Sequence, residues 1–350
     1  MTIHPTTLIF GQTSDLHIKS VLEQISFETI PLILDLSKFG TDYVATYKYN
    51  DSLSLSIRDK NNNVFDLSSV KKIWWRRPQP FIPEKDLDEK LNSYAIQEMN
   101  CFWGGILSSL QYQHIDWFND FDKHRAMDRK LNQLNLANQI GFLIPETCVT
   151  TDSDEAEEFI KKHNNEIIFK SFSGSEDFWQ PTRKYDPKDA KFLKTLVNCP
   201  VIFQKYIESI AEYRVTIIEN KMHIAIKRTE SSKYKYDIRI DLSLKYEIST
   251  LPLVIEEKLY RFMKLAGLKY GAFDLILSKN HEIFFIEINP AGQFMHIELE
   301  TGLKISESMA QSLSVNDESE RVFSSNKQTT IHFAKGLFAD LAVEKISHIS

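Results

Sequence analysis

Two apolar strands, each with one acidic residue that the pattern predicts to be buried, Asp274 and Glu287, are encoded by Phe273-Asp-Leu-Ile-Leu-Ser-Lys-Asn-His-Glu-Ile-Phe-Phe-Ile-Glu-Ile-Asn-Pro-Ala-Gly-Gln-Phe294. Between Ile283 and Ile288 the only polar residue is Glu287. A carboxylate in such a run is costly unless a cation or a hydrogen-bond donor compensates it. A bound metal ion is the simplest compensation, and a solvated hairpin with ordinary surface acids is the alternative.

The residues between the two strands predict a tight hairpin. The Lys-Asn-His sequence has the character of a turn, so residues 272–278 and 282–288 are expected to pair. Such a hairpin brings Asp274 beside Glu287, and Asn289 faces the same side as Glu287 because side chains alternate along a strand. Two carboxylates and an amide oxygen suit Mg²⁺ held partly by substrate phosphates. The pattern therefore indicates nucleotide chemistry.

The composition is that of an ordinary globular protein. Of the 350 residues, 42% are hydrophobic and 26% are charged, which excludes disordered and fibrous classes and allows two or three packed units. The 42 basic and 48 acidic residues give a net charge of −6, which argues against a general nucleic-acid-binding protein. We expect no nucleic-acid partner.

Cysteine usage and hydropathy favour a cytoplasmic protein. Cys101, Cys148 and Cys199 are far apart and lack metal-ligand spacing, as is usual in a reducing compartment. The N-terminal residues lack the pattern of a secretory signal. No apolar run approaches the about 20 residues that span a bilayer, so we expect no membrane partner.

The pattern of apolar residues divides the chain into three domains and a tail. The first domain alternates strands and helices, with a strand at 70–75 that ends before Pro78 and a helix at 86–110. After a short connection at 117–121, a helix at 124–140 ends at Gly141. The expected bounds are 1–120, 121–200 and 201–312 for the domains and 313–350 for the tail, whose role the sequence does not indicate.

The second and third domains are expected to be rich in strands. A helix at 252–266 precedes the closing hairpin, and residues 211–249 alternate in a strand-rich pattern. The remaining expected elements are strands at 166–170 and 201–207 with a helix at 187–197 between them.

Two lysines are candidates for phosphate binding. Lys170 ends a strand before a Ser-Phe-Ser-Gly-Ser loop that could approach a phosphate closely, and an ordinary surface lysine is the alternative. Lys130 lies on the helix at 124–140, where a charged face in solvent is the alternative. The order of these features along the chain is more informative than either lysine alone. A lysine on a helix is followed by a Gly-x-x-x-Pro segment and then by a lysine at the end of a strand, before a loop of small residues. The apolar strand Phe203–Ile207 comes next, and an Asp and a Glu-x-Asn motif follow it. In this order the chain resembles the ATP-grasp family.

The resemblance implies an α+β fold in which an N-terminal α/β pre-ATP-grasp domain precedes a central lobe and a C-terminal lobe that clamp ATP. The family reaction is ATP-dependent carboxylate ligation through an acyl phosphate that a nucleophile captures. Lys130 and Lys170 would contact the phosphates, and Glu212 would accept from the ribose hydroxyls. The residues implied to hold one or two Mg²⁺ ions are Asp274, Glu287 and Asn289. The residues implied to meet the adenine are Gln204, Lys205, Tyr206 and Ile207.

Three further segments are similar to the microviridin-type graspetide ligases, and the resemblance covers roughly residues 70–311. These segments are Val70-Lys-Lys-Ile-Trp-Trp-Arg-Arg-Pro78, Glu212-Tyr-Arg-Val-Thr216, and Glu287-Ile-Asn-Pro-Ala-Gly-Gln-Phe294 with Thr301-Gly302. Ala291 replaces a commoner Asn and Phe294 a commoner Trp, and neither change removes a ligand. Those enzymes bind a ribosomal precursor peptide by its leader and join Asp or Glu side chains of its core to Thr, Ser or Lys, which forms macrocyclic esters or amides.

Several arginines are candidates for handling the peptide. A guanidinium fork suits a carboxylate or an acyl phosphate, and we favour Arg214 and Arg239 as catalytic residues because both lie in motifs similar to those of the ligases. Surface ion pairs are the alternative for any one arginine. The candidates for substrate binding are Arg76, Arg77, Arg228 and Asp237, with structural packing as the alternative. The resemblance also implies a homodimer.

Two other functions stay open. The chain could be an ATP-grasp ligase that adds amino acids to a small-molecule or protein carboxylate. It could also be a non-catalytic ATP-binding protein, although both lysines and all three metal-ligand candidates are present. The Trp-Trp-Arg-Arg-Pro match favours the peptide macrocyclase.

Overall fold

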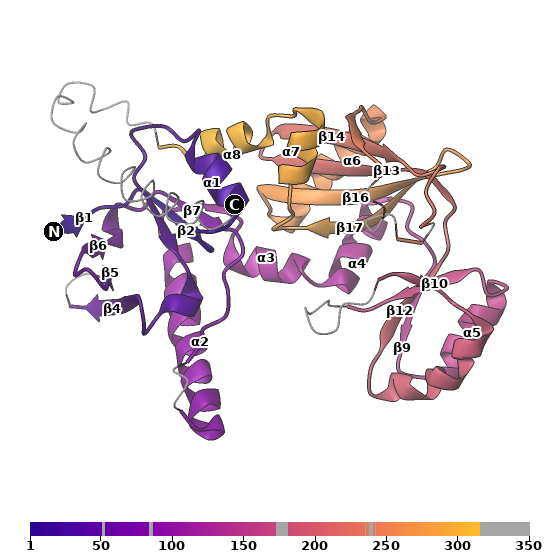
Figure 1. Ribbon diagram of the computed structural model, residues 1–350, viewed down its shortest axis with the longest axis horizontal. Coiled ribbons are helices and arrows are strands. Elements are labelled where there is room, and N and C mark those ends of the chain that lie inside the picture. Colours follow the sequence, from indigo (N-terminus) through magenta and orange to yellow (C-terminus); the bar gives the residue numbers. More distant parts are fainter. Residues whose placement is uncertain are drawn as a thin grey trace, which may run out of the picture. The chain divides into compact units, whose positions relative to one another are not determined.

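The computed structural model of the chain (Figure 1) describes residues 1–50, 53–83, 87–172, 181–234, 236–237, 241 and 243–315. Its contacts separate two compact units. Within the described residues, unit 1 comprises Met1–Phe118 and Ser306–Val315, and unit 2 comprises Asn119–Ile305. None of the helices in the described ranges has the length and apolar character that a membrane span needs.

Unit 1 is built on a sheet of four parallel strands. Their order is β3 (Pro31–Leu34), β2 (Thr7–Phe10), β7 (Lys72–Trp75) and β8 (Asp116–Phe118). All four residues of β2 are buried, as expected for a strand covered on both faces. The alternation of strands and helices expected in the first domain is present here, with α1 (Leu16–Leu22) between β2 and β3. Part of the short connection expected at 117–121 is instead β8, which extends the parallel sheet.

Further elements complete unit 1. A second sheet has the order β1 (Thr2–Ile3), β6 (Val64–Asp66), β5 (Leu53–Asp59) and β4 (Tyr43–Tyr49). The short 3₁₀ helices are η1 (Leu36–Lys38) and η2 (Leu67–Ser69). The long helix expected at 86–110 is α2 (Glu89–Gln111), and its Trp103 packs edge-on against Phe10. Beyond Ile305, α8 (Ile305–Leu313) returns to this unit, where Thr7 Oγ1 donates to the Leu313 carbonyl at 3.0 Å.

The smaller sheet of unit 2 is antiparallel. Its order is β11 (Arg183–Lys184), β10 (Ile167–Lys170), β12 (Val201–Lys205) and β9 (Thr147–Thr150). The strands expected at 166–170 and 201–207 are therefore confirmed. Its apolar core joins Ile167 and Phe203 to Ile160 of α5 (Ser153–Lys162) and to η3 (Pro187–Val197). The expected helix at 187–197 is present in the tighter 3₁₀ form.

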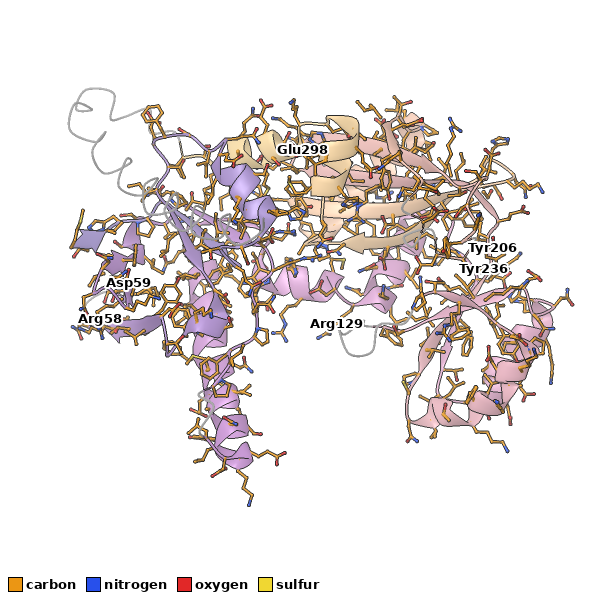
Figure 2. The ribbon with its side chains drawn as sticks, viewed as in Figure 1. Arg58, Asp59, Arg129, Tyr206, Tyr236 and Glu298 are labelled. Carbon is orange, nitrogen blue, oxygen red and sulfur yellow. The ribbon has the colours of Figure 1, made fainter. Side chains whose placement is uncertain are left out.

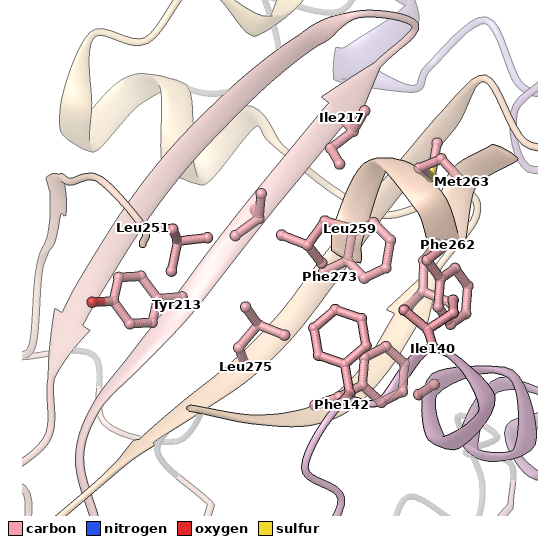
Figure 3. Close-up of a cluster of buried hydrophobic side chains, with 14 of the residues drawn as sticks. Ile140, Phe142, Tyr213, Ile217, Leu251, Leu259, Phe262, Met263, Phe273 and Leu275 are labelled. Carbon is pink, nitrogen blue, oxygen red and sulfur yellow. The ribbon is translucent and has the colours of Figure 1, made fainter. Parts of the chain in front are cut away.

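The larger sheet of unit 2 is also antiparallel and positions the site. Its order is β15 (Tyr246–Ile248), β14 (Lys221–Arg228), β13 (Ser209–Ile218), β16 (Tyr270–Ser278) and β17 (Ile283–Asn289). One face packs on α6 (Leu253–Ala266), and Figure 3 shows Leu259 and Phe262 of that helix beside Phe273 of the sheet. The expected strand-rich region at 211–249 contains three strands, but the described residues between Thr229 and Lys245 form none.

The helix expected at 124–140 is broken in two. The parts are α3 (Phe121–Met127) and α4 (Lys130–Ile140), and the extended backbone of Arg129 separates them (Figure 2). Side-chain amides of α4 replace the lost helical bonds, since Asn132 Nδ2 donates to the Ala126 carbonyl at 3.0 Å. The stop at Gly141 is confirmed by its left-handed conformation, with φ of 90°. The break makes Lys130 the first residue of α4.

Candidate active site

Asp274 and Glu287 lie directly opposite each other in the ladder between β16 and β17, which confirms the predicted hairpin. A bulge follows at once, because Leu275 pairs with Phe285 and leaves Ile286 as an extra residue. The bulge lets Phe285 and Ile288 both enter the core while Glu287 stays on the opposite face. Glu287 is therefore an acid on the edge of the core rather than inside it.

Asn289 completes an oxygen-rich patch on the same face of the sheet. It pairs with Ala272, two residues along from the Asp274–Glu287 pair, so the three side chains share one face. Its Oδ1 accepts a hydrogen bond from the Ala291 N–H at 3.0 Å, and a carbonyl oxygen retains a second lone pair. Two carboxylates and an amide are a hard donor set that fits Mg²⁺. Among the residues described, no group of three or more His, Cys, Asp or Glu could hold a metal.

Side-chain cations compensate both carboxylates. Lys130 donates from Nζ to Oε2 of Glu287, and Arg214 donates from Nη1 to Oδ1 of Asp274 at 2.7 Å. Burial opposes the charge of Arg214, but Asp274 outweighs this and raises the pKa of the guanidinium. Lys130 and Arg214 thus offset the free-energy cost of placing the two carboxylates beside the core. A bound metal would share these carboxylates with Lys130 and Arg214.

The turn after β17 is shaped by one glycine. A Cβ on Gly292 would lie 2.4 Å from Ala272 Cβ and 2.9 Å from Nη2 of Arg214. The Tyr270 hydroxyl donates to the Gly292 carbonyl at 2.6 Å, and Arg214 Nη2 donates to the Gln293 carbonyl at 3.1 Å. The close approach of the turn to the sheet therefore fixes the second terminal nitrogen of Arg214, Nη2.

Two buried side-chain amides, which the sequence analysis did not predict, stabilise the residues around the acid pair. Gln133 brackets Ile288, because its Nε2 donates to the Ile288 carbonyl at 2.9 Å and its Oε1 accepts from the Ile288 N–H at 3.1 Å. Gln133 lies one turn after Lys130, so α4 positions the lysine on Glu287 and the amide on the next residue. Asn119 donates to the Tyr270 and Pro290 carbonyls at 2.8 and 3.1 Å.

Of the residues expected to bind the nucleotide, Lys170 and residues 204–207 lie on the smaller sheet or directly after its strand β12, whereas Glu212 lies on β13 of the larger sheet. Lys170 is the last residue of β10 and is half-buried, and the loop that follows is described only up to Phe172. Gln204 is 1% exposed and its Nε2 donates to Thr147 Oγ1 at 2.9 Å, so its side chain is occupied within the sheet. Lys205 is exposed and Ile207 is half-buried.

An aromatic contact joins Tyr206, which directly follows β12, to the segment after β14. The rings of Tyr206 and Tyr236 meet edge-on at 5.0 Å (Figure 2), and Lys184 Nζ lies 5.9 Å from the Tyr236 ring centroid. Next along the chain, Asp237 is buried and its carboxylate accepts from the Thr182 N–H at 3.1 Å. Asp237 thus ties this segment to the smaller sheet.

The remaining candidates differ in accessibility. Arg239 lies outside the described residues. Arg228 is exposed at the end of β14. Arg76 in unit 1 is 2% exposed, with Nε 3.2 Å from Oδ2 of Asp15, while Arg77 is half-buried. Burial raises the pKa of Asp15, but the hydrogen bond with His17 and the charge of Arg76 outweigh it and lower the pKa to about 2.

An acid pair on one face of an antiparallel sheet, with a lysine of the neighbouring helix bonded to Glu287, fits the class of ATP-grasp carboxylate ligases. A family model of the RimK-like ATP-grasp domain matches residues 127–313, more than half of the chain. A model of the MvdD pre-ATP grasp domain matches residues 6–125. The chain therefore belongs to the RimK-like ATP-grasp family. A search of curated protein sequences finds no match.

Solved structures of similar fold include ligases of modified peptides. A RiPP-associated ATP-grasp ligase of Chryseobacterium gregarium, in complex with ADP and a leader and core peptide, is 28% identical with a TM-score of 0.80, over 88% of this chain and 96% of that one. Macrocyclase MdnB of Microcystis aeruginosa MRC is 26% identical with a TM-score of 0.75, over 90% and 100%. Macrocyclase MdnC of that organism, bound with precursor peptide MdnA, has a similar fold at 24% identity and a TM-score of 0.79, over 91% and 100%.

Proposed function

We propose that the chain uses ATP and Mg²⁺ to activate Asp or Glu side chains of a ribosomally made precursor peptide and joins them to Thr, Ser or Lys side chains. The observation that carries this proposal is the Asp274–Glu287 pair with Lys130 and Arg214 upon it. The similarity to peptide-bound ligases over most of the chain supports a peptide substrate. In this account the domains are 1–120, 121–200 and 201–312, and the enzyme acts in the cytoplasm as a homodimer.

The roles of the residues follow from the charges that meet in such a reaction. Lys130 and Lys170 would bind the phosphates, and Glu212 would accept from the ribose. Asp274, Glu287 and Asn289 would hold Mg²⁺, which supplies positive charge to the phosphate oxygens when bound. The segment proposed for adenine is Gln204, Lys205, Tyr206 and Ile207. Arg214 and Arg239 would hold the peptide carboxylate or its acyl phosphate, and Arg77 and Arg228 are more accessible to peptide than Arg76 or Asp237.

The chemistry proceeds in two balanced steps. A carboxylate oxygen of the peptide attacks the γ-phosphorus, the bond to the β–γ bridging oxygen breaks, and ADP leaves with that electron pair. A hydroxyl or amine of the same peptide then attacks the acyl carbon, loses its proton and expels phosphate, which forms an ester or an amide. The protein's part is to bring two anions together and to keep them aligned.

Intact mass of precursor peptides encoded beside this chain, after incubation with the enzyme, ATP and Mg²⁺, tests the proposal. Each ring removes one water, a loss of about 18 Da, with one ADP released. A mass gain would instead support the second candidate, a ligase that adds amino acids to a carboxylate. Nucleotide binding with neither a mass change nor ADP release would support a non-catalytic ATP-binding protein and would overturn the proposal.

A further inference from the structure

Lys227 is a cation on the active face of the larger sheet that the sequence did not single out. In the β13–β14 ladder it lies opposite Glu212, and in the β14–β15 ladder it lies opposite Tyr246. Residues directly opposite each other in an antiparallel pair project to the same face. Lys227 therefore shares the face of Glu212 and Arg214. It is the diagonal neighbour of Arg214, since Arg214 pairs with Ala225.

The side chain of Lys227 is held in place by an aromatic ring. Lys227 is 9% exposed, and its Nζ lies 4.3 Å from the ring centroid of Tyr246. Tyr246 is itself fixed, because its N–H donates to Oε2 of Glu300 at 2.7 Å and its ring contacts His296 at 5.8 Å. Glu300 and His296 belong to α7 (Met295–Thr301), which begins directly after the turn at Gly292.

The ammonium of Lys227 contrasts with the other cations of this face. Lys130 and Arg214 are each bonded to a carboxylate, whereas no carboxylate in the described ranges lies within 4 Å of Lys227 Nζ. Burial lowers the pKa of Lys227, and the more distant Glu300 and Glu212 act in the opposite direction. A nearly buried ammonium is stabilised when an anion pairs with it. Lys227 is thus a cation that a substrate anion can occupy.

We propose that Lys227, steadied by Tyr246, binds the side-chain carboxylate of the substrate peptide before it attacks ATP. This assignment rests on the proposed function. The metal-ligand candidates lie on β16 and β17, and β13 separates Lys227 from them, a distance of about 10 Å at the usual strand spacing. Phosphates held through Mg²⁺ at Asp274 and Glu287 would leave the part of the face above β14 to the second anion. Arg214 lies between the two positions.

The experiment compares Lys227→Met and Lys227→Arg with the wild-type enzyme, using a precursor peptide that the wild type converts. Lys227→Met should raise the KM for the peptide about ten- to hundredfold, and Lys227→Arg should restore most of the loss. The Kd of ADP with Mg²⁺, measured without peptide, should change less than about twofold. Lys264→Met, which removes an exposed lysine of α6, is the matched control and should behave as wild type.

A peptide whose ring-forming acids are replaced by amides separates contact from structural support. Wild-type enzyme loaded with ADP should bind this peptide more weakly than the native one, and in Lys227→Met the difference in affinity between the two peptides should be smaller. Thermal unfolding checks that each variant folds. If Lys227→Met binds the peptide as tightly as the wild type does, whether or not it loses affinity for ADP, the assignment is wrong. Turnover by the wild type would then still support the proposed function. A wild type that converts no peptide overturns both.

Discussion

Asp274 on β16 lies directly opposite Glu287 on β17, and each carboxylate is bonded to a cation from a different element. The pairing requires nothing beyond one hairpin, so two metal-ligand candidates are brought together by residues close in sequence. The cations come from farther away, Lys130 from α4 and Arg214 from β13. The hairpin therefore places the two acids, and tertiary packing places the cations that neutralise them.

Removing the charge of Glu287 should abolish turnover without unfolding the protein. In Glu287→Gln an amide replaces the carboxylate shared by Lys130 and the proposed metal, so kcat should fall about 100-fold or more. The measurement is ADP release against Mg²⁺ concentration. Glu282→Gln, which alters an exposed acid in the turn of the same hairpin, is the control and should leave kcat unchanged. Equal Mg²⁺ dependence in the two variants would refute a metal role for Glu287.

Gly292 should not tolerate even a methyl group. In Gly292→Ala the new Cβ meets Ala272 and Arg214, so we expect a loss of about 1–3 kcal/mol in the free energy of unfolding and reduced activity. Gly104→Ala is the matched control, since nothing lies within 4 Å of its Cβ position inside α2, and it should stabilise the helix by about 0.5–1 kcal/mol. Denaturant unfolding of both variants gives the two values. A neutral Gly292→Ala would contradict the close packing of this turn.

Asn119 should be needed for the stability of the backbone around Tyr270 and Pro290. Its amide donates to two carbonyls and its Oδ1 accepts from the Lys269 and Tyr270 N–H groups at 2.7 and 2.8 Å. Asn119→Ala leaves buried backbone groups without partners, which should cost about 3 kcal/mol or more of unfolding free energy. Asn280→Ala, in an exposed turn, should change it by less than about 0.5 kcal/mol. Similar unfolding curves for the two variants would contradict this role.

Comparison of the acid pair with the buried side-chain amides shows which parts of the site could be predicted from the sequence. Strand alternation and a turn are local signals, so the pairing of Asp274 with Glu287 was predictable. Gln133 bonds Ile288 across 155 positions of the chain, and no local pattern marks such an amide. Lys227 was missed because a lysine in an alternating strand is usually a surface residue. The break at Arg129 was missed because its stabilising bonds come from side chains of the following helix.

His124 should make the stability of unit 2 depend on pH. Burial lowers the pKa of this histidine to about 4, and Asp128, 3.5 Å from Nε2 and largely exposed, does not offset the effect. The folded state thus prefers the neutral ring. Its contribution is fully present above the unfolded pKa of about 6.5 and is lost as pH falls toward about 4, a loss of about 2–3 kcal/mol.

Unfolding free energies of wild type and His124→Gln at about pH 7 and about pH 4.5 measure this contribution. The variant should lose less stability on acidification than the wild type. His114→Gln, at an exposed position in unit 1, is the control and should keep the wild-type pH dependence. Parallel losses in wild type and His124→Gln would show that another group is responsible.

Transfer of oxygen from the peptide to phosphate tests most directly whether ATP activates a peptide carboxylate at this site. The carboxylates of the ring-forming side chains are labelled with ¹⁸O, and the phosphate released by wild-type enzyme is analysed by mass spectrometry. If an acyl phosphate forms, one labelled oxygen enters phosphate for each bond made, and Glu287→Gln releases neither product nor labelled phosphate. Rings formed with unlabelled phosphate would contradict carboxylate activation by ATP, the central step of the proposed function.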